Sequence, residues 1–147
     1  MNLSVMHAMN RPVGKKIVLI IDDDCGECNS ATDDNPYGAG MYEMHQALST
    51  RSEVAHLVYI PLTLDIDNIV SFTEELIQDL DADATHEIYI LLDMYYDKDG
   101  KRSKVGQSLY SSLLKSVILN NRTVSYATFS VGGVPKTGGE LPPTLLL

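Results

Sequence analysis

The stretch Ile88-Tyr89-Ile90-Leu91-Leu92-Asp93-Met94 is an apolar run that ends in a single carboxylate. A run of this length without polar alternation predicts a strand that is covered on both faces, as in a parallel sheet. Ile17-Val18-Leu19-Ile20-Ile21 has the same character and ends in Asp22-Asp23-Asp24. Functional groups of open α/β sheets gather outside the carboxyl ends of the strands. If the two strands are neighbours, we expect Asp22, Asp23 and Asp93 to converge at that edge.

Strand and helix patterns alternate along the rest of the chain. Apolar runs predict strands at residues 16–21, 54–62, 87–92 and 123–129. Helical spacing of apolar residues predicts helices at residues 36–48, at 66–80 after an Asp65 cap, and from Gly106 to about Asn120. The β-α alternation predicts right-handed crossovers and a parallel sheet with helices on both faces.

The length of 147 residues fits one domain with a real core. We expect a flexible leader at residues 1–15, an α/β domain at 16–129, and a tail at 130–147 that is rich in Gly and Pro. The end of the tail, Thr144 to Leu147, is a candidate edge strand. It would cover the edge of the fourth strand, either in the same molecule or in a second copy. An edge that stays exposed favours self-association, so a homodimer through the fourth strand is a further expectation.

The net charge of −9 argues against a nucleic-acid partner, since such proteins neutralise phosphates with basic residues. No basic face for an anionic membrane is evident, and no apolar run approaches the ~20 residues of a transmembrane helix. The first residues lack the apolar core of a secretory signal. We therefore expect a cytoplasmic protein with neither a nucleic-acid nor a membrane partner.

The acidic cluster has the ligand chemistry that Mg²⁺ prefers, which is hard oxygen donors. Bunched carboxylates repel one another, and a cation removes that penalty and can bridge a phosphoryl group. Asp93 stands alone at a strand end and is the better nucleophile, able to form an aspartyl phosphate. Asp22 and Asp23 offer two directions from one turn and are the better metal ligands. The cluster therefore predicts a magnesium site for phosphoryl transfer.

A strand ending in Asp-Asp, a third strand ending in Asp, and a fourth ending in Thr form a pattern that resembles the receiver domain of two-component response regulators. The resemblance covers residues 16–129 and implies a flavodoxin-like sheet of order 2-1-3-4, with a candidate fifth strand. It implies that Asp93 accepts a phosphoryl group from a histidine kinase or phosphotransfer protein, while Asp22, Asp23 and the backbone carbonyl of Tyr95 complete the Mg²⁺ shell. Thr128 falls on the hydroxyl residue that hydrogen-bonds the phosphoryl group.

The chain departs from this family after the fourth strand. Only 19 residues follow Thr128, too few for the family's remaining strand and two helices, and Lys136 comes too early for the family's lysine. The resemblance therefore describes a receiver that is reduced in its C-terminal part, or a fragment of a longer protein.

Two other functions remain open. A pseudo-receiver would bind a protein partner without accepting phosphate, and loss of the lysine favours that hypothesis. In a haloacid-dehalogenase-type phosphatase Asp22 would attack phosphorus and Asp24 would act as acid and base. Apart from these, we predict a phosphoacceptor switch rather than an enzyme.

Cys25-Gly-Glu-Cys28 has the spacing of a redox dithiol. The polar segment that follows delays the helix whose N-terminus would lower a thiol pKa, and the neighbouring acids would raise it. Redox activity is therefore a minor alternative.

Overall fold

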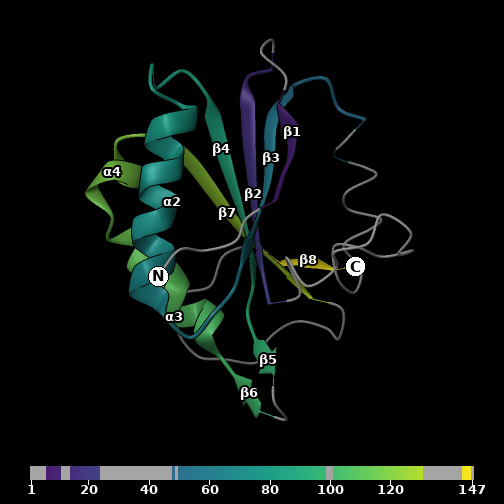
Figure 1. Ribbon diagram of the computed structural model, residues 1–147, viewed down its shortest axis with the longest axis vertical. Helices are drawn as coiled ribbons and strands as arrows, with labels where there is room; N and C mark the ends of the chain where they lie inside the picture. Colours follow the sequence, from purple (N-terminus) through teal and green to yellow (C-terminus); the bar gives the residue numbers. More distant parts are fainter. Residues whose placement is uncertain are drawn as a thin grey trace.

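The computed structural model describes residues 6–10, 14–23, 48, 50–98, 101–130 and 144–146. Its centre is a sheet of six strands in the order β1-β3-β2-β4-β7-β8 (Figure 1). The four central strands run parallel to one another: β3 (Val54–Pro61), β2 (Lys16–Asp22), β4 (Glu87–Asp93) and β7 (Thr123–Ser130). This is the predicted 2-1-3-4 order, and the α/β, flavodoxin-like class is confirmed.

The two outer strands fall in segments whose sequence pattern is less regular than that of the central strands. β8 (Thr144–Leu146) pairs in parallel with β7 at Thr128 to Ser130, so the predicted strand at the end of the tail forms within the same molecule. β1 (Met6–Asn10) pairs antiparallel with β3. The prediction of a leader without structure is therefore wrong for residues 6–10. Their own pattern is irregular, and their strand is defined by hydrogen bonding to β3 rather than by an alternating face.

Three helices lie on the same side of the sheet (Figure 1). α2 (Ile66–Leu80) begins at the predicted cap, where the Asp65 carboxylate accepts a hydrogen bond from the Asn68 N–H at 3.2 Å. Its buried face, together with α3 (Val105–Leu114) and α4 (Val117–Asn120), packs on alternate residues of β2 and β4. The helix predicted at residues 36–48 lies outside the described residues except for Leu48, which is helical and packs on the opposite face.

The third predicted helix is divided into α3 and α4. The break falls at Lys115 and Ser116, where the N–H of Ser116 bonds to the carbonyl of Leu113 and its hydroxyl oxygen caps α4 by accepting from the Leu119 N–H at 3.2 Å. A serine side chain that bonds to nearby backbone competes with helix continuation, which the apolar spacing alone does not reveal.

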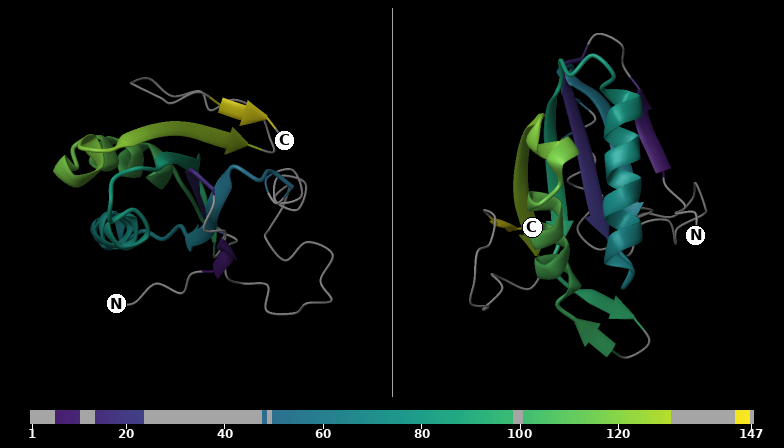
Figure 2. Two further views of the ribbon diagram at one scale, coloured as in Figure 1. Left: turned by 90° about the horizontal axis from the view of Figure 1, so that it is seen from above. Right: turned by 90° about the vertical axis from the view of Figure 1, so that its left-hand side faces the viewer.

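The polar insert before α3 also has structure. β5 (Tyr96–Lys98) and β6 (Lys101–Ser103) form an antiparallel pair that extends beyond the ends of β2 and β4, as the right-hand view of Figure 2 shows. This short antiparallel pair lies in a polar segment in which the apolar pattern predicts no strand. Within the described part of the chain, no helix is both long and apolar enough to span a membrane.

Candidate metal and phosphoryl site

The first two acids of the site follow a fully buried strand. Asp22 is the last residue of β2 and Asp23 follows it, and their exposed fractions are only 4% and 8%. The carbonyl oxygen of Asp22 accepts a hydrogen bond of 2.9 Å from the N–H of Leu62, which lies just beyond β3. This bond fixes the end of β2 against its neighbour, and the pair of acids is thereby held at the edge of the sheet.

The third acid, Asp93, ends β4 on the other side of β2. Its Oδ1 atom accepts a hydrogen bond of 3.1 Å from the backbone N–H of Tyr95, which orients the carboxylate. The turn after Asp93 is held against α3, because the N–H of Gly106 donates to the carbonyl of Met94 at 3.1 Å. A Cβ at Gly106 would lie 2.4 Å from the Asp93 carbonyl oxygen, so only glycine allows this approach.

The structure brings the three predicted acids together. One carboxylate oxygen from each of Asp22, Asp23 and Asp93 lies within 4.8 Å of the others. The alternation along the strands explains this, since Asp22 and Asp93 both lie on the sheet face opposite the three helices, as Ile20 and Leu91 do. The expectation that parallel neighbours collect these acids at one edge therefore holds.

The electrostatics of Asp93 reflect this crowding. Burial raises the pKa of Asp93 to about 6, and the nearby Asp23 carboxylate adds to the rise. Hydrogen bonds from the Tyr95 N–H and with Asp22 lower the pKa and offset part of the effect. The chain by itself thus stabilises the ionised form of this carboxylate poorly.

The donor set fits a divalent cation with a preference for oxygen. Asp22, Asp23 and Asp93 supply three carboxylates over a distance that one ion can bridge. The Asp22 carboxylate interacts with that of Asp93, and its buried Oδ2 atom accepts no hydrogen bond from the described residues. A cation would offset the mutual repulsion of the acids.

Thr128 lies on β7, the strand next to Asp93, one residue before the position that pairs with Asp93. It is paired with Leu92, whereas Phe129 is paired with Asp93. Thr128 is 1% exposed, and strand alternation places it on the helix-covered face with Leu92. In the backbone register Thr128 therefore lies one position before the level of Asp93.

Asp24, Cys25 and Cys28 lie outside the described residues. The contact between Gly106 and the turn after Asp93 is the part of the site that the sequence did not reveal, although a glycine at the start of a helical pattern is a signal of close backbone approach. Comparisons of the chain with protein-family models, curated proteins and solved structures found no match.

Proposed function

We propose that this chain is a receiver-like signalling domain that accepts a phosphoryl group at Asp93 from a histidine kinase or phosphotransfer protein. The observation that supports it is the meeting of three carboxylates within 4.8 Å at the carboxyl ends of two adjacent parallel strands. A site built this way, on the ends of rigid strands, suits phosphoryl transfer, in which the protein contributes positioning and charge neutralisation.

In this proposal the Asp93 carboxylate attacks phosphorus while the bond from phosphorus to the donor imidazole nitrogen breaks. The electron pair returns to the imidazole, and an acyl phosphate forms on Asp93. The Tyr95 N–H holds Oδ1 of Asp93 and so limits rotation of the attacking group. Because the pKa of Asp93 is about 6, the carboxylate is mostly ionised at neutral pH and available for attack.

Mg²⁺ is the proposed cofactor, with Asp22, Asp23, Asp93 and the backbone carbonyl of Tyr95 as its ligands. When bound it would neutralise the acids and the charge on the phosphoryl oxygens. Thr128 is the proposed phosphoryl hydrogen-bond donor, and it must reach the strand ends from the helix-covered face to act. The proposed location is the cytoplasm, where a histidine kinase domain would be the partner.

Incubation with acetyl phosphate and MgCl₂, followed by intact-mass measurement, tests the proposal. We expect one phosphoryl adduct that is absent in EDTA and absent in Asp93→Asn. Asp83→Asn changes an exposed aspartate that precedes β4, at the opposite end of the sheet from Asp93, so it is the matched control and should be modified normally. Thr128→Ala should still form the adduct if its hydroxyl only reads the phosphorylated state.

Three results would overturn the assignment. An adduct that persists in Asp93→Asn places the acceptor elsewhere. Turnover of a phosphate ester that depends on Asp22 identifies a phosphatase instead. Absence of adduct, turnover and Mg²⁺ binding, the last measured by calorimetry, leaves a domain that only binds a protein partner.

A further inference from the structure

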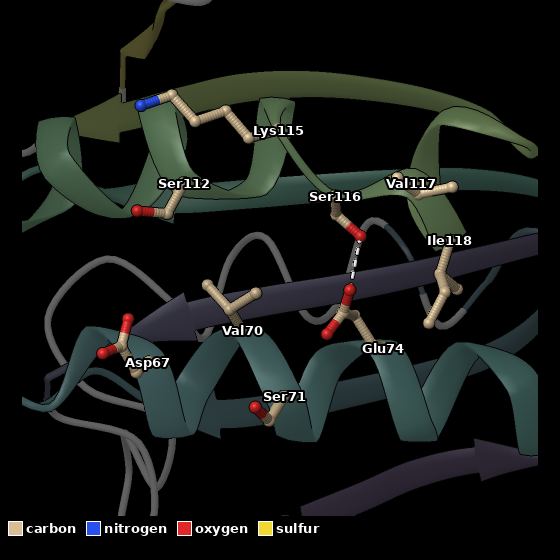
Figure 3. A pocket seen from close by; sticks show the side chains of 9 residues that line it. All are labelled: Asp67, Val70, Ser71, Glu74, Ser112, Lys115, Ser116, Val117 and Ile118. Atoms are coloured by element: carbon tan, nitrogen blue, oxygen red, sulfur yellow. Dashed lines mark hydrogen bonds between the residues drawn. The ribbon is translucent and has the colours of Figure 1, made fainter.

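A groove of about 510 Å³ lies between α2 and the segment formed by α3 and α4. Figure 3 shows its two walls, with Asp67 and Glu74 on α2 and Lys115 and Val117 on the opposite segment. The groove lies on the helical layer, whereas the acidic site lies on the opposite face of the sheet. It is therefore a feature that phosphoryl transfer at Asp93 does not use.

The groove is held in shape by a hydrogen bond between its walls. The hydroxyl of Ser116 donates to Oε2 of Glu74 at 2.6 Å, as the dashed line in Figure 3 marks. Ser116 is buried and also caps α4. This one residue therefore fixes the break between α3 and α4 and also the distance of that break from α2. A surface that is preformed in this way loses little conformational entropy when a partner binds.

Opposite charges stand on the two walls of the groove. Asp67 and Lys115 are both exposed, and they lie toward the same end of the groove in Figure 3. Within the part of the chain that the structure describes, neither of them takes part in an ion pair. Each is thus available to a group of opposite charge on another molecule.

An exposed apolar residue lies on the same surface. Val117 is 72% exposed and lines the groove, beside the partly buried Ile118. Among the described residues the only other large apolar side chain with high exposure is Leu64, which lies outside the groove. An apolar side chain flanked by charged groups is typical of a surface that another protein covers.

We infer that a second copy of this chain occupies the groove and forms a two-fold dimer. A two-fold axis along the groove sets the α3–α4 wall of one copy against the α2 wall of the other. Lys115 of each copy then faces Asp67 of the other, and both Val117 side chains leave water. One surface supplies both members of each charge pair, which is the self-complementarity that a two-fold interface requires. This interface is distinct from the β7 edge.

Sedimentation equilibrium of the purified chain, with series of single and double charge reversals, tests the inference. We expect a concentration-dependent dimer whose dissociation constant rises roughly tenfold or more in Lys115→Glu and in Asp67→Lys, since each reversal turns two attractive pairs into repulsive ones. The double variant Lys115→Glu with Asp67→Lys should restore the dimer to within about threefold. Val117→Asp should abolish it.

Matched controls separate the groove from general surface effects. Lys15→Glu reverses an exposed lysine elsewhere, and Leu64→Asp places a charge at the other exposed apolar residue, so both should dimerise normally. Circular dichroism tests whether each variant is folded. If Lys115→Glu does not fold, Lys115→Gln takes its place. A chain that stays monomeric at high concentration, equal behaviour of Lys115→Glu and Lys15→Glu, or a double variant without recovery would each overturn the inference. None of these results depends on whether Asp93 accepts phosphate.

Discussion

The two ends of the sheet each bury aspartate, and they treat its charge in opposite ways. At the amino end the carboxylate of Asp81 accepts hydrogen bonds from the Thr85 N–H at 2.9 Å, the His86 N–H at 3.0 Å and the His86 Nδ1 at 2.7 Å. Arg122, which precedes β7, contacts its Oδ2 atom at 3.0 Å. At the carboxyl end Asp22, Asp23 and Asp93 bring one carboxylate oxygen each within 4.8 Å of the others.

The pKa values follow this difference. Burial by itself raises the pKa of Asp81, but the hydrogen bonds from His86 and Thr85 and the charge of Arg122 outweigh it and lower the pKa overall. Burial and Asp23 together raise the pKa of Asp93 to about 6. Asp81 and its partners His86 and Arg122 link the end of α2 to the starts of β4 and β7, so this cluster has a structural role. At the carboxyl end three carboxylates crowd one another, and a cation would relieve their repulsion, so this end carries the proposed site.

Breaking the compensated end should have the largest effect. Asp81→Ala leaves Arg122, the His86 ring and two backbone N–H groups without their acceptor, and we expect a loss of about 3–5 kcal/mol in the free energy of unfolding. Urea denaturation measures it, and Asp79→Ala, at an exposed position of α2, should stay within about 0.5 kcal/mol of the parent chain. A parent-like midpoint in Asp81→Ala would mean that the cluster is not structural.

Removing a charge at the carboxyl end should change the free energy of unfolding in the opposite direction. Asn retains the Oδ1 acceptor for Tyr95 without the charge, so Asp93→Asn should stabilise the metal-free protein at pH 7, by at most about 3 kcal/mol from the rise in pKa. The raised pKa of Asp93 contributes stability that is fully present below about pH 4. This contribution is lost as the pH rises through 6. The two proteins should therefore agree near pH 3.5 and diverge above it.

Urea denaturation in EDTA across this pH range measures the difference. Added MgCl₂ should raise the stability of the parent chain and leave Asp93→Asn nearly unchanged, because a ligand stabilises only the state that binds it. The comparison between the two ends fails if Asp93→Asn is as unstable as Asp81→Ala. At the amino end the pH dependence of stability is reversed. The lowered pKa of Asp81 contributes stability that is lost as the pH falls and the carboxylate is protonated.

A third change tests how close backbone packing holds the carboxyl end. Gly106→Ala places a Cβ 2.4 Å from the Asp93 carbonyl oxygen and from the Met94 Cα, so that α3 or the turn after β4 must shift. We expect the free energy of unfolding to fall by about 1–3 kcal/mol, measured by urea denaturation, and Mg²⁺ binding to weaken, measured by calorimetry. Ser108→Ala on the exposed face of α3 is the control and should change neither. Unchanged metal binding would separate the helix contact from the site.

The sequence predicted the parts of the fold that depend on local pattern. Apolar runs identified β2, β3, β4 and β7, and the position of the acids after two of those runs was sufficient to predict that they meet. The break at Ser116 and the hairpin of β5 and β6 depend on hydrogen bonds between particular groups, which periodicity does not record.

The pairing partners were harder to predict than the strands. β1 and β8 are short and become strands by adding to the edges of β3 and β7, so their local sequence carries little of the information. The same applies to Asp81, whose partners lie 4, 5 and 41 residues away in the chain. For Thr128 the apolar pattern predicted the strand but not its pairing register, and the register decides which face the Thr128 side chain occupies.

The smallest expected effect concerns a buried polar group with neither kind of compensation. Thr73 on α2 is fully buried, and its Oγ1 atom has no hydrogen-bond partner among the described residues. Unlike Asp93, it bears no charge that an ion could satisfy, and unlike Asp81 it accepts no hydrogen bond from a described residue. Valine has nearly the same shape without the hydroxyl, so Thr73→Val should stabilise the protein by about 1 kcal/mol in urea denaturation. Thr73→Ala removes the methyl group as well and should destabilise it by leaving a cavity. If the valine variant were instead the less stable of the two, the hydroxyl would have a partner, and Thr73 would belong with Asp81 as a satisfied group of the core.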